Sequence, residues 1–227
     1  MLTQTFSGVN LQKRIAIVLP KGGVGKTTTA VNLAVSLAIQ GKSCLLIDCD
    51  PSGSCSQLLG FSSDTISAGL IDLLTYSKSL KQVILKTEIE LLDFIPAHFP
   101  DVEHEKRLSF LTSNQLLLRN VLESGADGYD YIIFDSPPYL DGITTLVLAA
   151  TNSVLIPIKS ENFSISALQR LTKYLKFIKE RYNNSIFVEG ILLTMFEVNT
   201  KASKFTEEQI YKHFGKYLFT TIIPKNS

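Results

Sequence analysis

The sequence predicts an α/β fold in which a mostly parallel sheet is covered by helices on both faces. Three observations support this: short apolar runs typical of buried strands, stretches of helical apolar periodicity between them, and a glycine-rich turn after the first run. Such sheets bind ligands at the carboxyl ends of their strands. A chain of 227 residues suits one domain with one core, and we expect that domain to span residues 1–227.

The N-terminal part predicts a strand, a helix and a second strand. Residues 14–19 are an apolar run closed by Pro20, which is typical of a buried strand. Between 26 and 40 the apolar residues recur at intervals of three and four, and Gly41 occupies the position of a helix C-cap. Residues 43–49 then predict the second buried strand.

The same alternation continues to the end of the chain. Further strands are predicted at 91–95, 131–134, 153–157, 187–194 and 218–223, and helices at 68–76, 115–124, 144–150, 166–181 and 206–214. The serine-rich stretch 52–86 is the variable part of the pattern. No repeat or Pro/Gly-rich linker marks a domain boundary.

Composition excludes several classes of protein. The net charge of +1 favours neither nucleic acid nor any other charged partner. No apolar run reaches the roughly 18 residues of a membrane span, and the N-terminus does not resemble a signal peptide, so we expect a cytoplasmic protein. Cys44, Cys49 and Cys55 form no CxxC pair and are interpreted as small buried hydrophobes rather than metal ligands.

The turn after the first predicted strand has the features of a phosphate-binding loop. Its glycines let backbone N–H groups point at an anion, and its end, Gly25-Lys26-Thr27, matches the usual Gly-Lys-Ser/Thr pattern, whereas Pro20 stands at the first glycine. Lys26 is expected at the β- and γ-phosphates and Thr27 on Mg²⁺. The expected nucleotide-binding residues are Lys21, Gly22, Gly23, Val24, Gly25, Lys26, Thr27 and Thr28.

Three acidic residues are predicted at the same sheet edge as this loop. Asp48 and Asp50 end the second strand, and Asp135 follows the strand at 131–134. An acid in this place can hold Mg²⁺ directly or through water, and another can position the water that attacks a phosphate. The convergence of loop and acids predicts an ATPase.

Several segments together resemble one protein family. Residues 21–28, KGGVGKTT, resemble the deviant Walker A motif of the ParA/MinD ATPases, whose additional lysine is Lys21 here. Residues 46–54 and 134–138 are similar to the family's DxDPQGN and DxPP segments. Three further segments resemble later blocks of ParA/Soj-type partitioning ATPases: Pro157 with Glu161, residues 190–196, and Ile223-Pro224-Lys225-Asn226.

The resemblance implies roles for individual residues. Lys21 would reach across a dimer interface to the partner's phosphates, and Asp50 would position the hydrolytic water, so these two are the expected catalytic residues. Thr27, Asp48 and Asp135 would serve the metal, and Pro224 would contact the nucleotide. The implied cofactors are ATP and Mg²⁺.

The resemblance also implies a function. ParA-type ATPases dimerise with ATP, bind DNA non-specifically, hydrolyse ATP slowly until a ParB-like adaptor stimulates them, and thereby partition plasmid or chromosomal DNA or other cargo at the nucleoid. Asn199 stands where the family has an arginine. Lys201, Lys204 and Lys225 are the candidate contacts to DNA phosphates.

Two alternatives remain open at the level of sequence. A MinD-like, membrane-cycling ATPase would need a C-terminal amphipathic helix, and the chain stops at Ser227, where family members continue, so we expect a truncated C-terminal end and no membrane contact. The other alternative is an enzyme built on the same scaffold, either an iron-sulfur reductase component or an ATP-dependent biosynthetic enzyme. The reductase would need cysteines that bridge two subunits, and the segment around residues 134–138 contains none.

Overall fold

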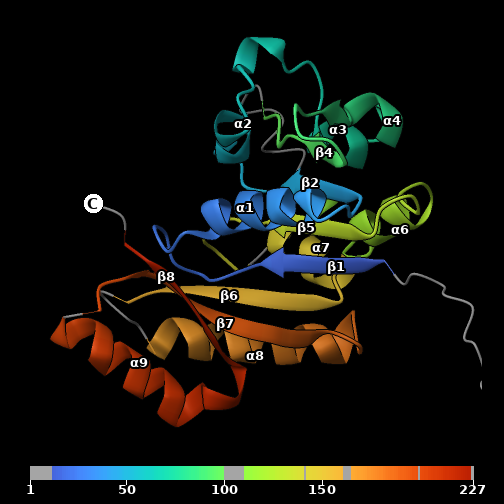
Figure 1. The fold of residues 1–227 in the computed structure, drawn as a ribbon. Coiled ribbons are helices and arrows are strands. Elements are labelled where there is room, and N and C mark those ends of the chain that lie inside the picture. The colour runs from blue at the N-terminus through green and yellow to red at the C-terminus, as the bar shows by residue number, and fades with distance from the viewer. Residues whose placement is uncertain (1–11, 100–109, 141, 161–164, 199, 226–227) are drawn as a thin grey trace, which may run out of the picture.

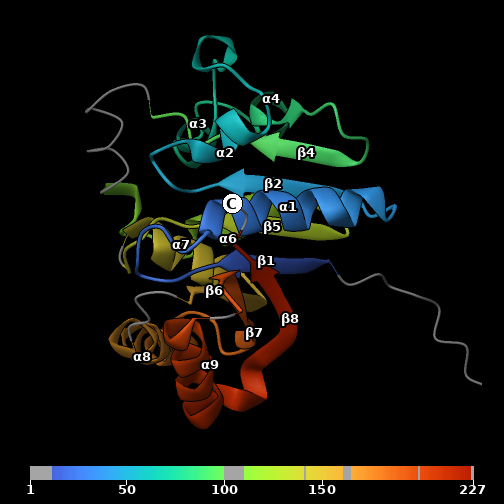
Figure 2. The same ribbon diagram turned by 60° about the vertical axis from the view of Figure 1, so that its left-hand side comes forward.

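The computed structural model describes residues 12–99, 110–140, 142–160, 165–198 and 200–225. Within them, one sheet of eight strands has the order β3-β4-β2-β5-β1-β6-β7-β8. All neighbouring strands run parallel except β3 and β4 (Figures 1 and 2). The predicted α/β class with one domain is confirmed.

The strands are short, as expected for buried parallel strands. In chain order they are β1 (Lys13–Ile17), β2 (Cys44–Asp48), β3 (Leu85–Lys86), β4 (Leu92–Ile95), β5 (Tyr131–Asp135), β6 (Ser153–Lys159), β7 (Phe187–Phe196) and β8 (Leu218–Pro224). Strand β1 lies between β5 and β6, so the chain continues on opposite sides of β1 in its first and second halves. Such a switch point is where doubly wound sheets bind ligands.

Helices connect the strands and cover both faces of the sheet. They are α1 (Lys26–Ile39), α2 (Ser54–Leu58), α3 (Leu70–Leu74), α4 (Leu80–Val83), α6 (Leu117–Glu123), α7 (Gly142–Ala150), α8 (Ile165–Arg181) and α9 (Lys201–Phe214), with 3₁₀ turns η1 (Ser63–Thr65) and η2 (Gly215–Tyr217). None of these helices combines the length and apolar character that a membrane crossing requires.

Two apolar cores hold these layers together. Helix α1 packs Ala30 and Ala34 against sheet residues such as Leu46 on one face. Helices α6, α7 and α8 bury their apolar sides on the other face, over residues that include Phe134 and Ile156. Figure 2 shows the strands stacked from β4 down to β7, with α1 in front of them. The two cores fix the carboxyl ends of β1, β2 and β5 relative to one another.

The element-by-element prediction is largely confirmed. Every predicted strand and helix is present, and the largest shift is in α9, which begins at Lys201 rather than 206. The earlier start follows from Thr200, whose side chain accepts a hydrogen bond from the Ser203 N–H and caps the helix. The sequence analysis missed five short elements, α2, η1, α4, β3 and η2, because segments of two to five residues carry no detectable periodicity.

Gly190 of β7 gives the first testable prediction. A Cβ at this position would lie 2.3 Å from the nearest ring carbon of Phe219 on β8. We expect Gly190→Ala to lower the free energy of unfolding by about 1–3 kcal/mol, because the ring must move off the strand. Urea denaturation measures this, with Gly128→Ala as control, since no atom lies within 4 Å of a Cβ there.

A double-mutant cycle with Phe219→Leu tests the cause. The cost of Gly190→Ala should shrink when the ring is absent. Equal costs in the two backgrounds would contradict the proposed clash.

Candidate functional site

The loop between β1 and α1 has the geometry of an anion-binding turn. Gly23 and Gly25 have φ values of 69° and 83°, in the left-handed region that favours glycine. Gly22 and Gly23 are exposed at the tip, and Val24 is buried beneath them. Helix α1 starts directly after Gly25 with no side-chain cap and no acidic residue in its first turn. Its N–H groups and the positive end of its dipole are therefore placed for a phosphate.

Lys26 is the charged residue most deeply set in this loop. Its side chain is buried, with 7% of its surface exposed, and its Nζ donates a hydrogen bond of 3.0 Å to the Lys21 carbonyl. Burial lowers the pKa of Lys26, while Asp135 and Asp50 nearby favour its charged form. Because a buried ammonium group gains from further negative charge, this environment suits a bound phosphate.

The neighbouring loop residues are more accessible than Lys26. Lys21 is half-buried, and its backbone N–H donates to the Leu19 carbonyl at 2.8 Å. Thr27 is half-buried in the first turn of α1, and Thr28 is exposed there. The hydrogen bond from Lys26 to the Lys21 backbone ties the two lysines to one loop conformation.

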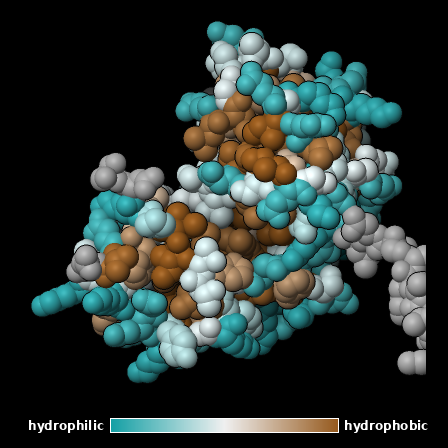
Figure 3. Space-filling model, in the orientation of Figure 1, coloured by the Kyte–Doolittle hydropathy of each residue, from teal (hydrophilic) through white to brown (hydrophobic). Residues whose placement is uncertain are grey.

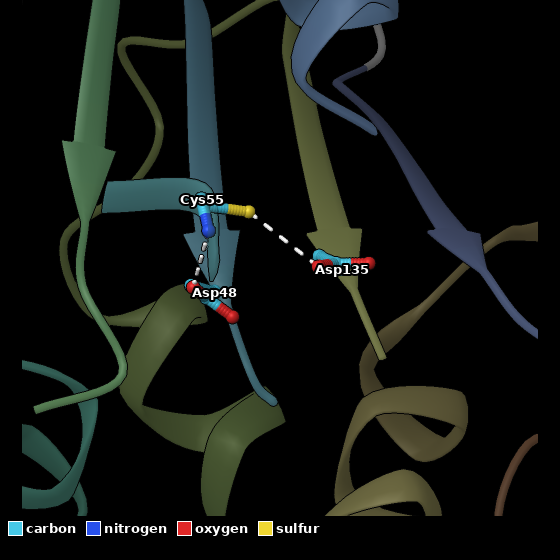
Figure 4. Close-up of side chains that lie close together, drawn as sticks. All are labelled: Asp48, Cys55 and Asp135. Atoms are coloured by element: carbon cyan, nitrogen blue, oxygen red, sulfur yellow. Dashed lines mark hydrogen bonds between the residues drawn. The ribbon is translucent and has the colours of Figure 1, made fainter. Parts of the chain in front are cut away.

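Two carboxylates meet beside this loop. Asp48 ends β2 and Asp135 ends β5, and the two are direct partners in the parallel register. Both are fully buried. Cys55 of α2 connects them: its N–H donates to Asp48 Oδ2 at 3.1 Å, and its thiol donates to Asp135 Oδ2 at 3.5 Å (Figure 4). One residue of α2 thus holds both acids in place.

Burial controls the ionisation of this cluster. It raises the pKa of Asp48 to about 7, with the charge of Asp135 adding to the effect and the N–H groups of Asp50 and Cys55 opposing it. It also raises the pKa of Asp135 to about 6, opposed by hydrogen bonds from Thr27 and Cys55. Burial and the two carboxylates raise the pKa of the Cys55 thiol, so it remains a hydrogen-bond donor. The cluster therefore favours an added positive charge.

The donors present fit a hard divalent cation. Asp135 Oδ1 is buried and has no hydrogen-bond partner among the described residues, and the Thr27 hydroxyl reaches the same carboxyl group. One ligand atom each of Asp48, Cys55 and Asp135 lie within 4.8 Å of one another. Mg²⁺ prefers oxygen ligands and keeps several waters, so Thr27 and Asp135 suit it better than the Cys55 thiol.

Asp50 lies at the rim rather than within the buried pair. Its N–H donates to Asp48 Oδ1 at 3.0 Å, and its own Oδ1 accepts from the Ser52 N–H at 3.0 Å. The Gly53 N–H closes the turn onto the Asp50 carbonyl at 2.9 Å. Asp50 is half-buried, so its carboxylate stays accessible at the mouth of the site.

The end of β7 supports the loop from the other side, which the sequence analysis did not predict. The Thr194 hydroxyl donates to the Val24 carbonyl at 2.9 Å, and a Cβ at Gly25 would lie 3.7 Å from the Met195 side chain. Pro224 pairs with Phe196, the residue after Met195, at the end of β8. The structure thus brings Pro224 to the same end of the sheet as the loop.

The three candidate DNA-contacting lysines lie beyond the carboxyl end of β7. Lys201 and Lys204 are exposed in the first turn of α9, and Lys225 forms an ion pair with Glu197. Glu161, Asn199 and Asn226, which also belong to the resembling segments, lie outside the described residues.

The cysteines were interpreted from sequence as buried hydrophobes. Cys44, Cys49 and Cys55 are all buried, which excludes them as ligands that bridge two subunits around a cluster. For Cys55 that interpretation was incomplete, since its N–H and thiol hold the two acids. No spacing rule in the sequence signals such a role.

Comparisons with known proteins find relatives over most of the chain. A family model described as an AAA domain matches residues 12–188. The chain is 36% identical over 214 residues to the sporulation initiation inhibitor protein Soj of Bacillus subtilis, covering 94% of this chain and 85% of the relative. It is 38% identical over 213 residues to the chromosome partitioning protein ParA of Myxococcus xanthus, covering 93% and 75%. These relatives do not favour the membrane-cycling alternative.

The solved structures agree on the fold. Cobyrinic acid a,c-diamide synthase from Mycobacterium smegmatis, crystallised with an ATP analog and magnesium, superposes with a TM-score of 0.87 at 23% identity, covering 95% of this chain and 88% of the other. At this identity the likeness shows the fold alone, since one fold hosts many functions.

The raised pKa values of the buried acids predict a pH dependence. Both acids bind protons more tightly in the folded than in the unfolded chain, so their contribution to stability is present below about pH 4 and is lost as pH rises through about 6–7. We expect Asp135→Asn to reduce this loss in the ligand-free protein. Its amide oxygen can still accept from Cys55, while its nitrogen takes the place of the unpartnered Oδ1.

Urea unfolding of both proteins at pH 5.5 and about pH 8 tests this prediction. Between pH 5.5 and about pH 8, the free energy of unfolding of the variant should increase relative to that of the parent by an amount on the order of 1 kcal/mol or more. An equal difference at the two pH values would contradict the raised pKa of Asp135.

Proposed function

The chain belongs to the family of ParA- and Soj-type partitioning ATPases, and on that premise we propose that it is an ATP-gated, dimerising switch that positions DNA or another cargo. One observation carries the proposal. The uncapped N-terminus of α1, the buried Lys26 and the buried Asp135 meet at one edge of the sheet. A phosphate chain and a divalent cation satisfy these opposite charges together.

We assign each residue of the site a role in hydrolysis. The loop N–H groups and Lys26 would hold the β- and γ-phosphates, and Thr27 with Asp135 would hold Mg²⁺, with Asp48 supporting its water shell. When bound, Mg²⁺ would neutralise negative charge on the phosphates during the transfer. Asp50, accessible at the rim, would orient the water that attacks the γ-phosphorus as the bond to the bridging oxygen breaks and ADP leaves.

A slow switch is the expected outcome of this arrangement. The Asp50 carboxylate accepts a hydrogen bond from the Ser52 N–H, so it would orient the attacking water rather than activate it strongly. Slow hydrolysis keeps the ATP state populated until an adaptor of ParB type accelerates it. The contribution of Lys21 would be made across the dimer interface, which couples nucleotide state to dimerisation.

The proposed function also includes DNA binding and a location in the cell. The ATP dimer would bind duplex DNA without sequence preference, and Lys201, Lys204 and Lys225 are candidate phosphate contacts. Such binding would place the protein on the nucleoid in the cytoplasm. We also propose that the chain binds Mg-ATP, forms a homodimer in the ATP state and works with an adaptor protein.

The two loop lysines should have separable effects. We expect Lys26→Ala to lose ATP binding, because the buried ammonium contacts the phosphates of its own subunit. Lys21→Ala should keep ATP binding but lose ATP-dependent dimerisation, because that side chain serves the partner's nucleotide. Fluorescent-nucleotide titration and light scattering measure the two properties. Dimerisation by the Lys21→Ala protein would refute the role across the interface.

DNA binding should depend on both nucleotide and salt. We expect the protein with the hydrolysis-blocking change Asp50→Ala to bind arbitrary duplex DNA with ATP, and to lose affinity steeply as salt rises, because phosphate contacts release counterions. Fluorescence anisotropy at several salt concentrations measures this, with ADP as the control. Absence of ATP-dependent, salt-sensitive binding would remove DNA from the proposed function.

A further inference from the structure

Helix α8 concentrates positive charge. Its 17 residues contain five basic side chains and one acidic side chain. The chain as a whole has 22 basic and 21 acidic residues, so the remainder, with 17 and 20, carries a net charge of −3. All five basic residues of α8 are exposed: Arg170, Lys173, Lys176, Lys179 and Arg181. This segregation of charge is hidden in the overall value of +1.

The basic side chains stand on the side of α8 that faces away from the sheet. The helix buries Ala167, Leu168, Leu171 and Ile178 in the core. Arg170, Lys173 and Arg181 lie on one outer face of the helix. Together with Phe177 they are spaced by three or four residues, and side chains at that spacing are neighbours on a helix surface. Lys176 Nζ lies 3.9 Å from Oε1 of Glu180, which is the one acidic residue of the helix. The outer face is therefore strongly basic along its whole length.

The aromatic residues of this face are packed against one another. Phe177 is 40% exposed. The centroid of its ring lies 5.9 Å from the ring centroid of Tyr174 and 5.7 Å from that of Tyr182. A membrane-surface helix inserts a broad apolar face, whereas the apolar face of α8 is already buried against the sheet. Hydrophilic residues dominate the lower margin of the molecule in Figure 3, where Figure 1 places α8 and α9. The surface thus suits a polyanion rather than a lipid bilayer.

Duplex DNA matches the length and charge of this face. From Arg170 to Arg181 the helix axis extends about 16 Å. Over that distance a duplex carries roughly ten phosphate charges. By comparison α9 carries three lysines against two glutamates, and Lys225 is paired with Glu197. Charge complementarity therefore favours α8 over the surface formed by Lys201, Lys204 and Lys225.

We propose that the outer face of α8 is the main contact surface for the phosphate backbone of duplex DNA. This inference rests on the proposed function, in which the ATP dimer binds DNA. It assigns the contacts to a helix that the resembling segments do not include. Lysine and arginine side chains there would contact phosphates rather than bases, so binding would be independent of sequence.

The test compares two matched triple variants in the Asp50→Ala background. One carries Lys173→Gln, Lys176→Gln and Lys179→Gln on α8, and the other carries Lys201→Gln, Lys204→Gln and Lys225→Gln. Each removes three charges from exposed positions, so the two have the same net charge. Binding of the ATP-loaded proteins to an arbitrary-sequence duplex is followed by fluorescence anisotropy across a salt series, with circular dichroism and ATP titration as controls for folding.

We expect the α8 variant to bind DNA at least about tenfold more weakly than the parent, with the slope of log K against log salt reduced by about 2–3. The α9 and β8 variant should lose clearly less in both quantities. A parental slope in the α8 variant, or a larger loss in the other variant, overturns the inference while the proposed function stands. Absence of DNA binding by the parent overturns the inference and removes DNA from the proposed function, while the ATP-gated switch is tested separately by dimerisation.

A second binding partner is tested in the same proteins. Sedimentation with vesicles of anionic phosphatidylglycerol should show no ATP-dependent binding. Vesicle binding that disappears with the α8 lysines would assign the face to membranes and overturn the inference.

Discussion

The structure depends on two buried carboxylates that the sheet brings together. Asp48 and Asp135 are partners at the ends of β2 and β5, where their burial and proximity raise both pKa values. The chain stabilises them with N–H groups from Asp50 and Cys55 and with the Cys55 thiol. These bonds fix α2 and the turn at Asp50 against the strand ends. The geometry of the rim is thus set by the needs of the buried acids.

The phosphate loop supplies the opposite charge at the same edge. Lys26 is buried beside the acids, and α1 begins without a cap, so positive and negative groups face a common space. The acids are not fully compensated by the loop, since Asp135 Oδ1 has no hydrogen-bond partner among the described residues. A nucleotide and its metal ion, bound together, would satisfy both. In the proposed function, this single site would report on the presence of a complete nucleotide.

Much of this was predictable from sequence, and the exceptions have physical causes. The glycine pattern around Lys26 and the strand-ending acids fix the loop and the sheet edge, because strand, turn and helix follow one another closely there. The bonds from Cys55 depend on α2, a helix of five residues without a periodic signal. The support of Val24 by Thr194 joins residues 170 positions apart, which only the fold reveals. The basic residues of α8 are visible in the sequence, but their common exposure follows from which side the helix buries.

The proposed switch requires that the γ-phosphate gates dimerisation. Sedimentation velocity of the Asp50→Ala protein with Mg²⁺ and either ATP or ADP tests it most directly, at protein concentrations around the expected dissociation constant of the dimer. We predict a dimer with ATP and a monomer with ADP. The same species with both nucleotides would contradict it, because a switch requires contacts that differ between its two states.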